Sequence, residues 1–130
     1  MLNKLYVCVL EAKDLPVKNS RVKLKLGKFK YKTRILRNTF NPIWNEEFVF
    51  KVKDIAEDVL VVNVVNHSDE SKVVDFVGEV RIPVSSVDFE DHRQILPPTW
   101  FELQCSNKSG KFFNKFCGLF PSLNYIPSIR

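Results

Sequence analysis

Basic side chains alternate with apolar ones through the segment RVKLKLGKFKYKTR, residues 21–34. Lysine and arginine bind phosphate oxygens, lysine as a point charge and arginine as a planar fork of donors. Because successive side chains of a strand point to opposite faces, the basic residues of each half share one face if both halves are strands. The segment therefore predicts a cationic surface. Its residues are Arg21, Lys23, Lys25, Lys28, Lys30, Lys32 and Arg34.

A two-residue turn at Gly27 and Lys28 would join these strands into a hairpin with a fixed register. The predicted opposite pairs are Lys25 with Lys30, Lys23 with Lys32, and Arg21 with Arg34. Each pair is like-charged, and like charges directly opposite each other destabilise a sheet by a few tenths to about 1 kcal/mol. An anionic ligand would relieve this repulsion. The alternative is a solvated face whose lysines only protect the sheet from edge pairing.

The positive charge is concentrated in the amino-terminal third of the chain. Residues 1–39 contain eleven Lys and Arg against two acids, a net +9, whereas residues 40–130 contain nine basic and thirteen acidic residues, a net −4. This asymmetry predicts an anionic partner. Nucleic acid is disfavoured, because Phe29 and Tyr31 alternate onto the face opposite the lysines and so cannot form a base-stacking platform beside them.

Residues for catalysis or metal binding are sparse. His67 and His92 lie in polar segments without a nucleophile nearby, and neither a G-x-S-x-G motif nor a phosphate-binding glycine loop occurs. The three cysteines, Cys8, Cys105 and Cys117, are odd in number and lack the close pairing of a zinc site, which suits ordinary thiols in the reducing cytosol. The sequence therefore predicts a protein that is not an enzyme.

Apolar residues with a period of two indicate an all-β fold. We expect seven short strands with close sequential neighbours, which favour an antiparallel β-sandwich. A closed barrel is the alternative. The longest apolar stretches run for fewer than ten residues, whereas a membrane-spanning helix needs about 20. The expected strands begin at residues 5–9 and continue with 22–26, 29–36, 46–52, 59–65, 76–84 and 100–104.

Four stretches resemble the C2 domain family in the expected order. They are LYVCVLEAKDLP at residues 5–16, NPIWNEEFVF at 41–50, DFVGEV at 75–80 and WFEL at 100–103. The resemblance covers roughly residues 2–105, and within the family it is strongest to plant proteins that join such a domain to a GRAM domain. It implies an eight-stranded antiparallel sandwich. Independently of the family, Asn41 and Pro42 predict a turn that aims Trp44 at the core.

Family members typically hold calcium between loops at one end of the sandwich with about five aspartates, and this sequence lacks most of them. Both first-loop aspartates are missing, because Pro16 leads almost directly into the next strand. Asn66, Ser68 and Asp75 fall at three third-loop positions, where only Asp75 is a carboxylate. Calcium prefers six to eight oxygen ligands, several of them charged. We expect no cofactor and no functional calcium site.

The carboxy-terminal end departs from the family pattern. Pro121 and Pro127 interrupt the segment after Cys117-Gly118, and proline cannot donate to a strand ladder. We expect the final strand to be altered or missing, with the sandwich at residues 1–105 and an atypical strand or irregular tail at 106–130.

Together these features predict a non-enzymatic, cytoplasmic, peripheral membrane module. Its expected ligands are anionic lipids such as phosphoinositide or phosphatidylserine, which bind the basic hairpin without calcium; lysine-rich strands of similar C2 domains bind such lipids. The alternative is a scaffold module whose cationic face receives an acidic protein segment.

Overall fold

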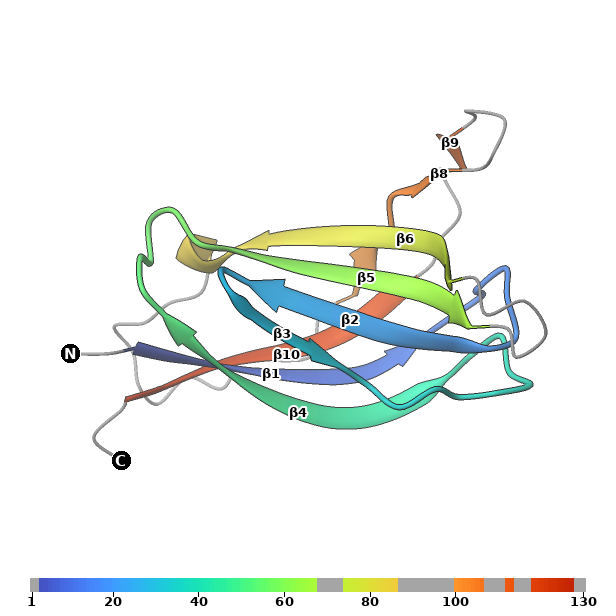
Figure 1. The fold of residues 1–130 in the computed structure, drawn as a ribbon, viewed down its shortest axis with the longest axis horizontal. Coiled ribbons are helices and arrows are strands. Elements are labelled where there is room, and N and C mark those ends of the chain that lie inside the picture. The colour runs from blue at the N-terminus through green and yellow to red at the C-terminus, as the bar shows by residue number, and fades with distance from the viewer. Residues whose placement is uncertain (1–2, 68–73, 87–99, 107–111, 114–117, 128–130) are drawn as a thin grey trace.

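The computed structural model describes residues 3–67, 74–86, 100–106, 112–113 and 118–127, which form an antiparallel β-sandwich (Figure 1). One four-stranded sheet has the order β4 (Ile43–Val52), β1 (Asn3–Ala12), β10 (Gly118–Pro127) and β7 (Phe101–Glu102). The other has the order β3 (Phe29–Lys32), β2 (Ser20–Leu26), β5 (Val59–His67) and β6 (Val74–Pro83). The short elements are η1 (Val84–Ser86) and the pair β8 (Cys105–Ser106) and β9 (Phe112–Phe113). The predicted all-β sandwich is confirmed.

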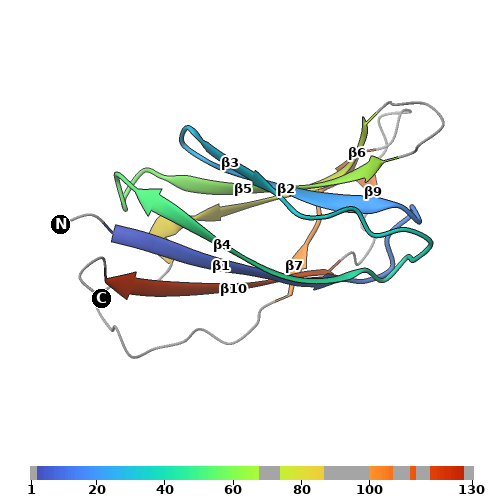
Figure 2. The ribbon, with the colours of Figure 1, turned by 60° about the horizontal axis from the view of Figure 1, so that its bottom comes forward.

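The two sheets lie face to face, as Figure 2 shows, and their inward side chains form the core. Period-two alternation explains which residues are inside, because every second side chain of a half-buried strand faces the partner sheet. The first sheet contributes Leu5, Val7, Val9, Trp44, Phe50 and Val52. The second sheet contributes Val22, Leu24, Leu26, Leu60, Val62, Val64, Val80 and Ile82.

The turn before β4 has the predicted effect on Trp44, whose side chain is completely buried. Asn41 Oδ1 accepts the backbone N–H of Asp14 at 2.9 Å, and the carbonyl of Pro42 accepts the N–H of Ala12 at 3.0 Å. These bonds attach the turn to the end of β1. Trp44 Nε1 then donates to the carbonyl of Arg34 at 3.1 Å, so its polar atom is satisfied inside the core.

The alternative that the final strand is missing is wrong, because β10 lies in the first sheet beside β1. Strand β10 pairs with β1 from Asn3 opposite Pro127 to Ala12 opposite Leu119, with one irregularity after Val9. Successive backbone amides of a strand point alternately to its two sides, so prolines six residues apart lack their N–H on the same side. Proline is tolerated where one side of a strand is unpaired, and beyond Leu119 β10 has no partner on its β7 side among the described strands.

Candidate functional site

The part of the basic hairpin nearest its turn has the predicted register. Lys23 lies opposite Lys32 and Lys25 opposite Lys30 in the antiparallel ladder of β2 and β3. Gly27 has a φ of 58°, at the first of the two loop residues, where a tight hairpin turn favours glycine. The ladder brings four ammonium-bearing side chains to one exposed face. We name the surface formed by Lys23, Lys25, Lys30 and Lys32 the lysine face.

The third predicted pair, Arg21 with Arg34, does not form, because β3 ends at Lys32. The next residue, Thr33, is buried. Its N–H donates to the carbonyl of Val22 at 2.9 Å, and its Oγ1 accepts the N–H of Val22 at 2.9 Å. The chain then turns toward β4. The N–H of Arg34 donates to Glu46 Oε2 at 3.0 Å, and its Nη2 donates to the carbonyl of Trp44 at 3.2 Å. Arg34 therefore braces the two sheets and is not part of the lysine face.

The two remaining basic residues of the predicted surface lie at its margins. Arg21 is half-buried opposite Val65, and its Nε donates to the carbonyl of Thr33 at 3.1 Å. Lys28 lies in the turn, with its Nζ 5.7 Å from the centre of the Phe29 ring. The structure thus brings together four of the seven predicted residues.

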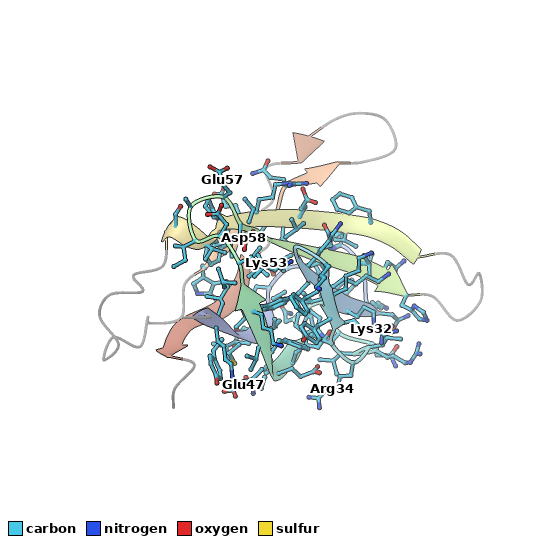
Figure 3. All side chains as sticks on the ribbon, turned by 60° about the vertical axis from the view of Figure 1, so that its left-hand side comes forward. Lys32, Arg34, Glu47, Lys53, Glu57 and Asp58 are labelled. Atoms are coloured by element: carbon cyan, nitrogen blue, oxygen red, sulfur yellow. The ribbon has the colours of Figure 1, made fainter. Side chains whose placement is uncertain are left out.

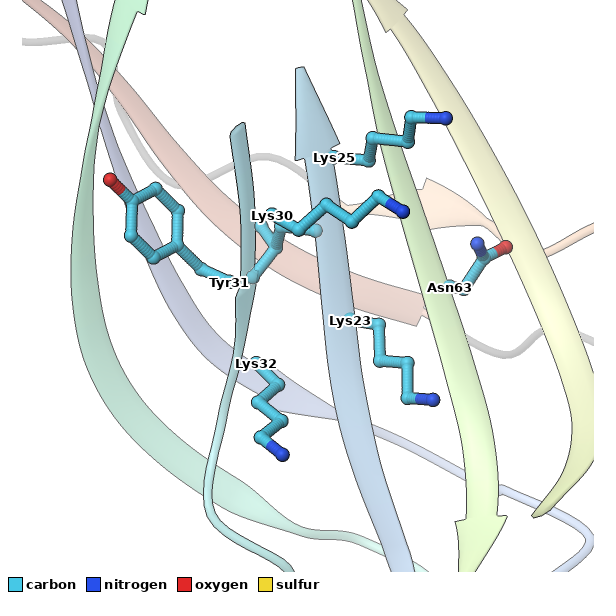
Figure 4. A pocket seen from close by; sticks show the side chains of 7 residues that line it. Lys23, Lys25, Lys30, Tyr31, Lys32 and Asn63 are labelled. Atoms are coloured by element: carbon cyan, nitrogen blue, oxygen red, sulfur yellow. The ribbon is translucent and has the colours of Figure 1, made fainter. Parts of the chain in front are cut away.

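A groove of about 400 Å³ lies on the lysine face, bounded by its four lysines, the backbone region of Leu24 and Tyr31, and Asn63 of β5. Figure 4 shows Lys23, Lys25 and Lys30 extending toward the side of Asn63, whereas Tyr31 points the other way. The ring of Tyr31 lies 5.8 Å from that of Phe48 and 5.0 Å from that of Phe50. The prediction that Tyr31 faces away from the lysines is confirmed.

Asn63 is a groove residue that sequence reasoning missed. It lies opposite Lys23 in the ladder of β2 and β5, and its Oδ1 is buried without a hydrogen-bond partner among the described residues. A buried acceptor without a donor costs free energy. The available signal is that Asn63 is the only polar residue in the run Val59–Val65.

The neighbouring acid does not neutralise the lysine face. Glu79 lies opposite Asn63, but its Oε2 accepts a hydrogen bond from Nε of Arg81 at 3.0 Å on the same strand. Within the described part of the chain, none of the four lysines forms a salt bridge. The described side chains therefore do not cancel the positive field over the groove, which favours an anionic ligand.

The degenerate calcium positions are only partly described. Asn66 on β5 lies opposite Asp75 on β6, and Ser68 lies outside the described residues, as does His92. Between Leu15 and Ser20 the first loop presents Pro16, Val17, Lys18 and Asn19, none of which is a carboxylate. Among the described side chains, no three of His, Cys, Asp or Glu gather closely enough to hold a metal ion.

Cys8 lies on the outer face of the first sheet, directly opposite Glu47. Burial, and secondarily the charge of Glu47, raise the pKa of its thiol above the ordinary value. We expect iodoacetamide at pH 8 to alkylate Cys8 more slowly in the folded chain than in urea, because less thiolate is present. Glu47→Gln should speed the reaction and the matched Glu102→Gln should not, as measured by mass spectrometry of the Cys8 peptide. Equal rates in the folded and unfolded chains would contradict this expectation.

The fold and the groove define the class of protein as an antiparallel β-sandwich with a cationic groove, and the comparisons with known proteins name the family. The C2 domain family model matches residues 3–103. The chain is 40% identical over 123 residues to a C2 and GRAM domain-containing protein of Arabidopsis thaliana, a match that covers 88% of this chain and 11% of that protein. It is 31% identical over 137 residues to human synaptotagmin-1, a match that covers 97% of this chain and 31% of that protein.

Two solved structures share the fold. A C2 domain of plant extended synaptotagmin 1 has a TM-score of 0.74 at 24% identity and covers 96% of this chain and 95% of its own. Human GIVD cytosolic phospholipase A2 has a TM-score of 0.79 at 22% identity and covers 98% of this chain but 18% of its own. The chain therefore belongs to the C2 domain family of lipid- and membrane-binding modules, and it spans less than a third of the curated relatives described above. The predicted resemblance to the plant C2 and GRAM group is confirmed.

No helix in the described part of the chain is long and apolar enough to cross a bilayer.

Proposed function

We propose that this C2 domain is a non-enzymatic module that attaches peripherally to the cytoplasmic surface of membranes by binding anionic phospholipids. The proposal rests on the lysine face, where Lys23 lies opposite Lys32 and Lys25 lies opposite Lys30. These four lysines bound a groove that also contains Asn63, whose Oδ1 is buried without a partner among the described residues. Lipid phosphates would relieve the repulsion between the lysines. The head groups of phosphoinositides and phosphatidylserine present such phosphates at the membrane surface.

The expected affinity of the isolated module is low. A basic residue near an anionic membrane surface contributes about 1 kcal/mol, so the four lysines of the face give about 4 kcal/mol. That value corresponds to a dissociation constant of about 1 mM. A second membrane-binding domain on the same polypeptide would raise the effective affinity by increasing the local concentration. The C2 and GRAM domain-containing protein of Arabidopsis thaliana, of which the match covers 11%, is an example of a C2 domain on a longer polypeptide with a further domain.

Co-sedimentation with vesicles tests the proposal against a scaffold function. The domain should sediment with phosphatidylcholine vesicles that contain phosphatidylserine or phosphoinositide, and not with phosphatidylcholine alone. A module whose cationic face serves only an acidic protein segment would sediment with neither. Absence of binding to both anionic vesicles at low salt would therefore refute the lipid proposal and favour the scaffold.

We expect calcium to have no effect on this binding. The first loop offers no carboxylate, and Lys18 Nζ lies 5.6 Å from the centre of the Phe40 ring at the same end of the sandwich. Binding of calcium to the native state alone would raise the melting temperature by mass action. Millimolar calcium should change neither the melting temperature nor vesicle binding. A rise in melting temperature that is abolished by Asp75→Ala would overturn this expectation.

A further inference from the structure

A second, smaller cavity lies beside the turn of the basic hairpin and is separate from the groove on the lysine face. Its volume is about 130 Å³, several times the roughly 30 Å³ that a water molecule occupies in the liquid. The hairpin turn forms one wall, and the end of β4 with the following loop forms the other. The lining residues are Leu26, Gly27, Lys28, Phe29, Lys51, Lys53 and Asp58.

The charges around this cavity are unequal, because three lysines, Lys28, Lys51 and Lys53, line it with a single carboxylate. Oδ2 of Asp58 already accepts the backbone N–H groups of Lys53 and Asp54, both at 3.1 Å. Asp58 and Lys53 lie next to each other in Figure 3, away from Lys32. No salt bridge to Lys28, Lys51 or Lys53 occurs within the described ranges.

A second carboxylate of the same loop, that of Asp54, is also engaged by backbone groups. Asp54 Oδ1 accepts the N–H groups of Ala56 at 3.0 Å and Glu57 at 3.3 Å, which fixes its carboxylate within the loop. The cavity therefore keeps a net charge of +2 from its lining side chains. Three lysines from two separate parts of the chain line this one small cavity, and ammonium groups donate to phosphate oxygens.

We propose that this cavity binds one phosphate monoester group. A dianion matches the net charge of the lining, and its three terminal oxygens match the three lysines. The hydrophobic parts of Leu26 and Phe29 form the rest of the wall, so the cavity has room for the phosphate and not for a large head group. The site is independent of the lysine face, because Lys28 is the only residue of the predicted basic surface that lines it.

Titration of the isotope-labelled domain with inorganic phosphate tests the site without a membrane. The amide signals of Gly27, Lys28 and Lys53 should shift with saturation, at constant ionic strength maintained with chloride. Lys53→Gln should weaken the binding by about fivefold. The matched variant Lys23→Gln removes the same charge from the lysine face and should leave the affinity unchanged. Both spectra also report whether each variant is folded.

Vesicles with equal surface charge then identify the source of the phosphate. Phosphatidate presents a phosphate monoester, whereas phosphatidylserine presents a diester. If Lys53→Gln weakens binding to phosphatidate vesicles but not to phosphatidylserine vesicles, the site accepts a lipid phosphate. If the variant weakens binding of inorganic phosphate but of neither kind of vesicle, the ligand is a soluble phosphate. Shifts that do not saturate, or that Lys23→Gln weakens as much as Lys53→Gln, would overturn the site. Because the phosphate titration contains no lipid, failure of membrane binding is a separate result.

Discussion

The double variant Lys23→Glu, Lys32→Glu should bind phosphatidylserine vesicles at least about 30-fold more weakly than the parent chain. Two basic residues near an anionic surface contribute about 2 kcal/mol, and reversal of both charges adds repulsion to that loss. The fold should persist, because both side chains are exposed and the variant replaces a like-charged pair by another one at the same positions. Vesicle co-sedimentation over a series of lipid concentrations measures the affinity, and circular dichroism checks the fold.

A matched pair on the other sheet provides the control. Lys4 lies on β1 of the first sheet and Lys13 follows that strand directly, and neither lines the lysine face or the smaller cavity, so Lys4→Glu, Lys13→Glu makes the same charge change elsewhere. This variant should retain most of the binding to phosphatidylserine. Raising the salt from about 0.1 M to 1 M should weaken the parent as well, because the screening length falls from about 10 Å to 3 Å. Equal weakening by the two double variants would show that net charge, and not the lysine face, determines binding.

Trp44→Ala should lower the free energy of unfolding by about 3–5 kcal/mol. Its side chain is fully buried, and the variant also removes the Nε1 donor to the carbonyl of Arg34. Domains are stable by only about 5–15 kcal/mol, so this loss would leave the protein close to unfolding. Urea unfolding followed by circular dichroism gives the measurement.

Trp100→Ala is the control for this prediction, because Trp100 is 37% exposed and has a lysine, Lys13, with its Nζ 4.5 Å from the ring centre. An exposed cation–π contact contributes about 0.5–1 kcal/mol, so the loss should be clearly smaller than for Trp44. Similar losses for both variants would mean that burial of Trp44 does not stabilise the sandwich in the way proposed.

The sequence predicts the lysine face well because its geometry is local. A two-residue turn at Gly27 and strict alternation are sufficient to place Lys23 opposite Lys32. The inward position of Thr33 still follows the alternation, but the ladder ends at Lys32, and Arg34 is directed to β4 by its contacts with Glu46 and Trp44. Those contacts depend on the packing of one sheet on the other, which the spacing of residues within the hairpin does not encode.

Two other features depend on long-range pairing and could not be predicted from local patterns. The prolines of β10 suggested a missing strand, yet the strand pairs with β1 along most of its length and has only a short partner, β7, on its other side. Lys51 and Lys53 are isolated in sequence from the basic hairpin, and the closed sandwich brings them beside Lys28. Local patterning therefore identifies the lysine face but does not identify the cavity next to it.

The pairing of β1 with β10 joins residues as distant as Asn3 and Pro127, whereas the basic hairpin closes over a two-residue turn. A hairpin forms in about 1–10 μs, but the first sheet cannot be completed until β10 has been synthesised. At about 5–20 residues per second, roughly 5–20 s separate the synthesis of Lys32 from that of Pro127. During this interval the edge of β1 has no β10 to cover it, and such an edge can pair with other chains. The same interval exposes the hairpin lysines on a chain whose first sheet is incomplete, so their charge can attract other anionic polymers before the domain has folded.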